Sequence, residues 1–418
     1  MASPEQARDD GAVVEPQQGP DGAVVEAVRR RVLFLATRVE PDRGVSGASA
    51  HAAASLAALR RRFDVAAVFA DSGRPGVERS GPTHVRRLVP ARVRGLRQDL
   101  RLLSGSGTAT RRAVDEGRRF GASVVYERNE YLSLVGRQVA RRLGIPLVLE
   151  VNGVLELDMR VFYRSLAEPL GRVLERRKYR IADAIVTTSE TLARELVARG
   201  ARAERVHVVP YAVRPELLEP AGRRPSASGD IVVGWLGHGL PWHGLDLLAD
   251  AAALLAEDPQ VVFRVVGGGP AVDQLRDRVA SSPLDARFSF RKAVPAADVR
   301  QALAEFDIGV VPQNPTDRFP IKLLEMGAAG LPVAAPTMPC ILDLLTPGEH
   351  FEPFEPGSPS DLARALRVLA HDPQRRASLG SSLRDHVAGQ FAVDMAADRL
   401  HAVVESVSPR DGRSQEAV

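Results

Sequence analysis

The strongest constraint on the fold is a pattern of short β-branched runs that alternate with amphipathic helical stretches from Arg31 onward. This alternation is typical of βαβ units, in which helices cover both faces of a parallel sheet. The expected strands form two series, and the Pro-, Gly- and Ser-rich segment EPAGRRPSASG at 219–229 separates them. The chain is therefore predicted to be an α/β protein with two doubly wound, Rossmann-like domains.

The predicted site lies between these domains, because ligands of doubly wound sheets bind at the carboxyl ends of the strands. The first series of strands is expected at 32–36, 64–70, 123–127, 146–151, 184–188 and 206–210, and the second at 231–237, 261–267, 288–294, 307–312 and 332–335. The expected division is a leader at 1–28, a first domain at 29–214, a linker at 215–229, a second domain at 230–382, C-terminal helices at 383–407 that pack back toward the first domain, and a tail at 408–418. Leader and tail are expected to be disordered.

Composition argues against several classes of function. A net charge of only +4 over 418 residues, with 5% aromatic residues, is not typical of a nucleic-acid-binding protein. The sequence has no apolar run long enough for a membrane span and no signal-like apolar core near its start. Cys340 is the only cysteine, so no intrachain disulfide can form, and we expect it to be a small buried side chain. These features favour a cytoplasmic protein.

The most informative segment is Asp317–Pro332, DRFPIKLLEMGAAGLP, in which two acids flank Lys322. A carboxylate can accept hydrogen bonds from both vicinal hydroxyls of a ribose, and a helix N-terminus attracts a diphosphate. The segment resembles the signature of the group 1, family-four retaining glycosyltransferases of GT-B fold. That signature is an acid, seven residues and a Glu, followed by a small-residue helix and Gly-x-Pro-Val. Asp317 and Glu325 have this spacing, with Asp317 in place of the usual Glu.

Five further motifs follow the family's order, so the resemblance extends from about residue 31 to about residue 405. They are SGASAH at 46–51, TTSETLARELVARG at 187–200, VGWLGHGLPWHGLDLLADA at 233–251, VVGGGPAVDQL at 265–275 and ALAEFDIGVVP at 302–312. The resemblance implies a hexosyltransferase that moves a hexose or amino-sugar from a nucleotide diphosphate sugar to an acceptor hydroxyl with retention. The acceptor would be a small molecule, a lipid-linked molecule or a glycan.

The resemblance also implies roles for individual residues. Glu325 would hold the ribose, Asp317 the donor sugar and Lys322 the phosphates, and the chain has only two other lysines, Lys178 and Lys292. Asn152 replaces a frequent His and can hydrogen-bond hydroxyls without shuttling protons. With Asp317 and Lys322 it forms the predicted catalytic set. The other predicted donor-binding residues are Gly47, Gly237, His238, Gly239, His243, Gly268, Phe319, Pro320, Ile321 and Leu324. The glycines could instead be ordinary turn residues, and His243 could be a solvated residue at a helix start.

Acceptor residues are expected in the first domain. Glu127, Arg128 and Glu130 lie at the end of the strand at 123–127, where they are either acceptor contacts or members of a salt-bridged loop. His51 lies one turn into an expected helix, where it either packs, contacts acceptor, or serves as the base of an inverting enzyme. A catalytically impaired homologue that acts as a partner subunit remains a further alternative.

No cofactor is expected beyond the nucleotide sugar, which is a co-substrate. The chain contains no Asp-x-Asp pair, so we expect no bound metal and neutralisation of the diphosphate by Lys, Arg and helix N-termini. The stretch Arg86–Leu103, RRLVPARVRGLRQDLRLL, holds six Arg and one Asp among Leu and Val. It is either a solvated helix face or a contact with an anionic or lipid-linked acceptor or with the inner face of the membrane.

Overall fold

The computed structural model describes residues 29–39, 47–71, 83–86, 99–100, 102, 106–161, 165–219 and 229–407. The expected leader, the expected tail, residues 220–228 of the linker and most of the Arg86–Leu103 stretch lie outside the described residues.

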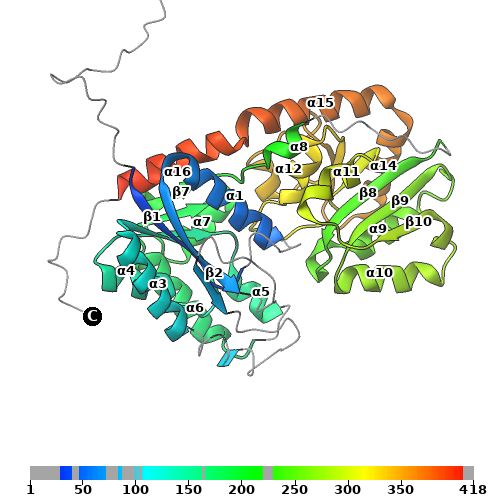
Figure 1. The fold of residues 1–418 in the computed structure, drawn as a ribbon. Helices are drawn as coiled ribbons and strands as arrows, with labels where there is room; N and C mark the ends of the chain where they lie inside the picture. Colours follow the sequence, from blue (N-terminus) through cyan, green and yellow to red (C-terminus); the bar gives the residue numbers. More distant parts are fainter. Residues whose placement is uncertain are drawn as a thin grey trace, which may run out of the picture.

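Two parallel sheets form the framework of the molecule (Figure 1). In the first, seven described strands lie in the order β3-β2-β1-β4-β5-β6-β7, and in the second, six lie in the order β10-β9-β8-β11-β12-β13. The strands are β1 (Arg31–Ala36), β2 (Asp64–Asp71), β3 (Thr83–Arg86), β4 (Val124–Arg128), β5 (Leu147–Val151), β6 (Ala184–Thr187), β7 (Val206–Val208), β8 (Ile231–His238), β9 (Val261–Gly268), β10 (Phe288–Arg291), β11 (Ile308–Val310), β12 (Val333–Pro336) and β13 (Glu352–Phe354). The predicted α/β fold with two doubly wound domains is confirmed.

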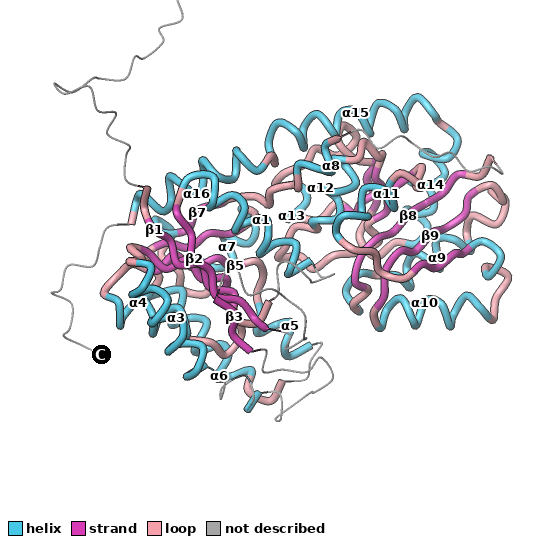
Figure 2. The backbone as a smooth tube through the Cα atoms, in the orientation of Figure 1, coloured by secondary structure: helices cyan, strands magenta, loops and turns pink. Residues whose placement is uncertain are grey.

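Helices cover both faces of each sheet (Figure 2). They are α1 (Gly47–Arg62), α3 (Ser106–Phe120), α4 (Val135–Leu143), α5 (Leu155–Val161), α6 (Glu168–Ile181), α7 (Glu190–Ala198), α8 (Pro215–Leu218), α9 (Leu245–Ala253), α10 (Pro270–Ala280), α11 (Val299–Leu303), α12 (Ile321–Ala328), α13 (Pro339–Leu342), α14 (Pro359–His371), α15 (Pro373–Gln390) and α16 (Val393–Ser406). In the first domain α1 and α16 share one core with the sheet, while α3, α4, α6 and α7 pack on the opposite face.

The second domain has the same layered arrangement. Leu248 of α9, Leu275 of α10 and Leu366 of α14 pack on one face of the sheet. Helices α11, α12 and α15 cover the other face, in a core that includes the buried Cys340. In each sheet the strand order reverses beside a central strand, β1 in the first domain and β8 in the second. Such reversal points place ligand sites at the carboxyl ends of the adjoining strands.

Each expected strand corresponds to a strand of the structure, whereas β3 and β13 were not expected. Both are short strands at the edge of a sheet. Edge strands of three or four residues have too few positions for a periodic apolar pattern.

The chain crosses between the domains twice. It enters the second domain after β7 and returns after α15, and at this second crossing Val213 N donates to the carbonyl oxygen of Phe391 at 2.7 Å. Helix α16 then packs on α1, where Arg62 Nε donates to Asp398 Oδ1 at 2.8 Å. The last described helix therefore belongs to the core of the first domain.

Candidate active site

A glycine-rich turn forms the edge of the second domain that faces the cleft. Gly237, at the end of β8, has φ 148°, and Gly267, at the end of β9, has φ 151°. A Cβ on Gly267 would overlap the carbonyl oxygen of Gly237, so the two strand ends can approach this closely only as glycines. Gly268 and Gly239 follow these residues, and nothing lies within 4 Å of a Cβ placed on Gly268. The turn therefore has open space at Gly268, whereas a Cβ on Gly239 would lie 2.6 Å from Val272 Cγ2.

Lys322 lies in the first turn of α12, beside this glycine turn. Its Nζ is 4.3 Å from the centroid of the Trp235 ring and 3.4 Å from the position of a Cβ on Gly237. No described residue accepts a hydrogen bond from this ammonium. Burial lowers the pKa of Lys322 to about 7, and the nearby Glu325 opposes that effect. A buried cation with unused donors is a binding site for an anion.

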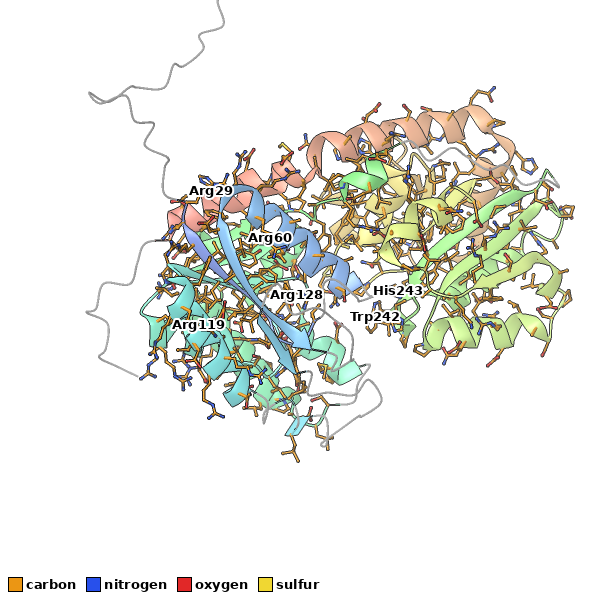
Figure 3. All side chains as sticks on the ribbon, in the orientation of Figure 1. Arg29, Arg60, Arg119, Arg128, Trp242 and His243 are labelled. Carbon is orange, nitrogen blue, oxygen red and sulfur yellow. The ribbon has the colours of Figure 1, made fainter. Side chains whose placement is uncertain are left out.

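His243 lies at the end of a 3-10 helix, Pro241–His243, on the same side of the cleft. Its Nδ1 accepts a hydrogen bond from Leu240 N at 3.0 Å. Burial and the neighbouring Lys322, His238 and Arg318 lower the pKa of His243 to about 2. His243 is therefore neutral, whereas His238 is exposed at the end of β8. Figure 3 shows Trp242 and His243 on the side of the second domain that faces the first.

Glu325 lies one turn after Lys322 on α12 and is half-buried. Its Oε1 is 3.6 Å from Nη2 of Arg214, whose Nη1 donates to the carbonyl oxygen of Ala296 at 2.7 Å. Burial raises the pKa of Glu325, while Arg214 and Lys322 lower it. Sequence reasoning missed Arg214. The sequence does place Arg214 directly before the predicted linker, and a long side chain at that position can reach the second domain.

Asp317 contacts both domains. Its Oδ2 accepts a hydrogen bond from Val154 N of the first domain at 2.7 Å and lies 3.1 Å from Arg318 Nη2. Arg318 also binds both carboxylate oxygens of Asp158 on α5, at 2.7 and 3.0 Å. A Cβ on Gly153 would lie 2.6 Å from the guanidinium carbon of Arg318, so this arginine packs directly on first-domain backbone. Arg318 and Asp158 were both missed from the sequence.

Most side chains of the segment 319–324 are buried. Phe319 is 2% exposed and Leu324 0% exposed, and both belong to the second-domain core. Pro320 is buried and Ile321 is half-buried. The Cγ2 atom of Ile321 lies 4.0 Å from a Cβ position on Gly47, so the amino ends of α12 and α1 meet across the cleft. A ligand at this junction would meet backbone amides rather than the Phe319 or Leu324 side chains.

The first domain contributes a small polar hollow formed around Glu150. Glu150 accepts hydrogen bonds from Tyr126 Oη at 2.7 Å and from Asn152 Nδ2 at 2.6 Å. His51 Nδ1 lies 3.5 Å from Glu150 Oε1, and the His51 ring centroid is 3.6 Å from that of Tyr211. The cavity among these residues is about 20 Å³, room for about one water molecule.

Two polar groups of this hollow have no hydrogen-bond partner among the described residues. They are the ring nitrogens of His51 and Asn152 Oδ1, and each of these atoms is buried. Burial, together with Arg128, holds the pKa of His51 well below its usual range. The imidazole is therefore neutral and lies against Tyr211.

The other predicted acceptor residues differ in their surroundings. Glu127 is buried and accepts a hydrogen bond from Gly136 N, at the start of α4, at 2.8 Å, and burial raises its pKa to about 7. Glu130 accepts from Thr37 Oγ1 at 2.6 Å and from Arg38 N at 2.7 Å. Arg128 is the last residue of β4 and is half-buried, and its Nε has no hydrogen-bond partner among the described residues. Glu127 and Glu130 thus form their hydrogen bonds inside the first domain.

A buried ionic network lies behind these carboxylates. Lys178 Nζ is 2.6 Å from Glu175 Oε1 and donates to the carbonyl oxygen of Glu130 at 2.9 Å and to Asn129 Oδ1. Asn129 Nδ2 donates in turn to Glu175 Oε2 at 2.6 Å. Two hydrogen bonds and one ion pair therefore hold Lys178 within the first domain.

Two absences among the described residues concern metal binding and membrane spans. In this part of the chain no three His, Cys, Asp or Glu side chains lie close enough together to hold a metal ion. None of the described helices has the length and apolar composition that a membrane span requires.

Comparisons with known proteins agree with this fold. Two solved structures match 90% of the chain: sucrose-phosphate synthase from Thermosynechococcus elongatus, with TM-score 0.77, 17% identity and 98% of that chain covered, and Anabaena Alr3699/HepE in complex with UDP-glucose, with TM-score 0.67, 19% identity and 100% of that chain covered. At these identities the likeness concerns the fold.

Sequence relatives include two enzymes of actinobacteria. The 2-deoxystreptamine glucosyltransferase of Streptomyces kanamyceticus is 26% identical over 80% of this chain and 92% of its own length. The D-inositol 3-phosphate glycosyltransferase of Thermobispora bispora is 28% identical over 74% of this chain and 76% of its own length. Residues 44–212 match the family described as Glycosyl transferase 4-like domain, and residues 230–372 match Glycosyl transferases group 1. The chain belongs to the group 1 glycosyltransferases of GT-B fold.

Proposed function

We propose that the protein transfers a hexose or amino-sugar from a nucleotide diphosphate sugar to an acceptor hydroxyl, with retention of configuration. The observation that carries this proposal is Lys322, a buried ammonium without a hydrogen-bond acceptor among the described residues, placed between the glycine turn and Glu325. The relatives support a sugar transfer, and Anabaena Alr3699/HepE has been solved with UDP-glucose.

The diphosphate binds between Lys322 and the glycine turn in this proposal. The first turn of α12 contains no acidic residue, so its free amide groups and the helix dipole add to the positive potential. Binding of the dianionic diphosphate favours the charged form of Lys322, because it supplies the hydrogen-bond acceptors that the protein does not. His243 contributes a neutral ring to the wall of this site.

Glu325 and Asp317 define the two ends of the donor. The Glu325 carboxylate accepts hydrogen bonds from the ribose hydroxyls, and Arg214 at 3.6 Å opposes the rise in the pKa of that carboxylate that burial causes. Asp317, held by Val154 N and Arg318, places one carboxylate beside the backbone of 319–321, where the sugar hydroxyls would lie. Asn152 and Arg128 lie on the first-domain side, and Asn152 Oδ1 and Arg128 Nε are buried atoms without a hydrogen-bond partner among the described residues.

The surroundings of His51 support retention over inversion. An inverting enzyme needs a base that reaches the acceptor, but His51 is buried against Tyr211. In the proposed reaction the acceptor oxygen bonds to the anomeric carbon as the bond from that carbon to the diphosphate oxygen breaks. The electron pair leaves with the nucleoside diphosphate, and the acceptor proton passes to its phosphate oxygen. Lys322 and the helix amides stabilise the charge that develops there.

The experiment is a donor screen followed by product analysis. A thermal-shift panel of UDP-, GDP-, ADP- and dTDP-sugars identifies the donor. Release of nucleoside diphosphate is then measured with polyol acceptors such as 2-deoxystreptamine and inositol phosphate, the acceptors that the relatives' names suggest. NMR of the product reports the anomeric configuration. An inverted product would reject the retaining mechanism.

A matched pair of variants distinguishes an active glycosyltransferase from a catalytically impaired homologue. Lys322→Ala should abolish most turnover, whereas Lys292→Ala, at an exposed lysine of the same domain, should leave it unchanged. A wild-type protein that binds donors but neither transfers nor hydrolyses them would instead favour a catalytically impaired homologue.

A further inference from the structure

The outer face of α6 exposes large apolar side chains in a row. Leu170 and Val173 of α6 are 44% and 61% exposed, and Leu166, two residues before the helix begins, is 71% exposed. The spacing of three residues places Leu170 and Val173 on one side of the helix. The inner side of α6 packs on the first domain through Gly171, Glu175 and Lys178. The row is therefore an unpartnered apolar surface.

Leu100 extends this surface beyond the helix. It is 57% exposed and directly follows Asp99. The Asp99 carboxylate accepts hydrogen bonds from the backbone N–H groups of Leu166 and Ala167, both at 3.0 Å. Four of the nine large apolar side chains that are exposed among the described residues thus lie at this one place. Such clustering is unusual on a monomeric protein and marks an interaction site.

Arginines continue the same face toward the end of the helix. Arg176, Arg177 and Arg180 are exposed, and no ion pair joins Arg176 or Arg177 to another described residue. Glu168 pairs with Arg172 at 3.8 Å, and Glu175 is turned inward to Lys178. The exposed part of α6 after Glu168 is therefore apolar and basic.

Neighbouring helices add positive charge to this side of the molecule. Helices α3, α4 and α6 lie along the same side of the first domain (Figures 1 and 2). Arg118 and Arg119 of α3 and Arg141 and Arg142 of α4 are exposed, and Figure 3 shows Arg119 projecting outward. A helix with an apolar row, flanking arginines and a basic surround is the pattern of a segment that lies in a membrane interface.

We propose that the α6 outer face, defined as Leu100, Leu166, Leu170, Val173, Arg176 and Arg177, docks on an anionic lipid bilayer. The leucines and Val173 enter the boundary between headgroups and acyl chains, and the arginines bind lipid phosphates. Charge complementarity selects an anionic lipid surface.

The test is sedimentation of the full chain with vesicles, without any sugar donor. Vesicles of phosphatidylglycerol and phosphatidylcholine should bind the protein, and pure phosphatidylcholine vesicles should bind it weakly. Binding should fall when salt rises from about 0.05 M to about 0.5 M, because the screening length shortens. Leu166→Asp with Leu170→Asp, and separately Arg176→Glu with Arg177→Glu, should each weaken binding by at least about tenfold.

Two control variants change exposed residues of the second domain. Leu254→Asp, at a leucine that is 52% exposed, and Lys292→Glu should leave vesicle binding unchanged. All variants should keep the wild-type melting temperature, since the changed side chains are exposed. Absence of binding to anionic vesicles, or wild-type binding by both α6 double variants, would overturn the proposal. A dimer in light scattering that the α6 variants abolish would overturn it too, and would assign this face to a second copy of the chain.

Discussion

The two domains share one architecture but use the charged groups of their cleft edges differently. In the first domain Glu127 Oε1, Glu130 and Lys178 form hydrogen bonds within the domain. In the second domain Lys322 contacts a Trp ring and the glycine turn, and its donors are free among the described residues. This difference indicates that a charged group that binds a ligand can be identified by its missing hydrogen-bond partner within the protein. A charged side chain near the cleft is not sufficient.

The largest expected effect is on stability and belongs to the first domain. Lys178→Ala would leave Glu175 buried without its cation, and breaking a buried pair in this way costs about 3–5 kcal/mol of unfolding free energy. Urea unfolding measures the loss. Lys322→Ala is the matched variant in the second domain and should cost no stability, because burial already disfavours its charged form. Equal destabilisation by the two variants would contradict the assignment of a structural role to Lys178 and a ligand-binding role to Lys322.

The next effect is on donor binding. Glu325→Gln keeps the size of the side chain but removes its charge, and the loss of a charge-assisted hydrogen bond should weaken donor affinity by about 1.5–3 kcal/mol. Isothermal titration with the donor found in the thermal-shift screen measures this, and circular dichroism checks that the fold is kept. An affinity equal to that of the wild type would remove Glu325 from the ribose site.

A third prediction separates the two basic residues of the proposed diphosphate site, Lys322 and His243. Lys322→Ala should lower kcat/KM at least about tenfold more than His243→Ala, which corresponds to about 1.4 kcal/mol of barrier. The reason is that His243, with a pKa lowered to about 2, carries no charge near neutral pH. If His243→Ala abolished turnover while Lys322→Ala were nearly silent, the charge would belong to the histidine side of the site.

The pH dependence sharpens the same assignment. The pKa of Lys322 is lowered to about 7 in the free protein, so its charged form, which binds diphosphate, disappears as pH rises through that value. We expect kcat/KM to fall above about pH 7, since this ratio reports groups of the free enzyme. Lys322→Arg should restore activity only partly but should move the alkaline fall to higher pH. An unchanged profile in Lys322→Arg would assign the fall to another group.

The last prediction is that removing metal ions has no effect on the rate of transfer. Glycosyl transfer should be equal in excess EDTA and in added Mg²⁺, because Lys322 and the α12 amides would neutralise the diphosphate. Rates with and without chelator decide this. A strict metal requirement would contradict the proposed charge distribution in the cleft.

Sequence reasoning succeeded where the signal is local. The runs at 231–237 and 261–267 predict parallel strands because they are rich in apolar β-branched residues, and both occur as β8 and β9. The spacing of Asp317 and Glu325 likewise lies within one strand-to-helix segment. The burial of Cys340 was predicted as well.

Sequence reasoning did not predict the contacts that depend on how distant elements pack together. The contacts of Asp317 with Val154 and of Arg318 with Asp158 join residues about 160 positions apart, on two separately folded units. No periodic pattern encodes the closure of two domains. The segment YERNEY placed Glu127 at a strand end but did not reveal that its carboxylate bonds to the start of α4. Side-chain direction at a strand end is set by packing.

The return of α16 to the first domain has a consequence for synthesis on the ribosome. Residues 229–390 are continuous in the chain and contain every element of the second domain from β8 to α15, so this domain can form as soon as they emerge. The first domain begins earlier but finishes later, because the apolar side of α1 stays uncovered until residue 406 has been translated. Domains generally fold in the order of synthesis. In this protein the order is reversed, and the domain made first is the last to be completed.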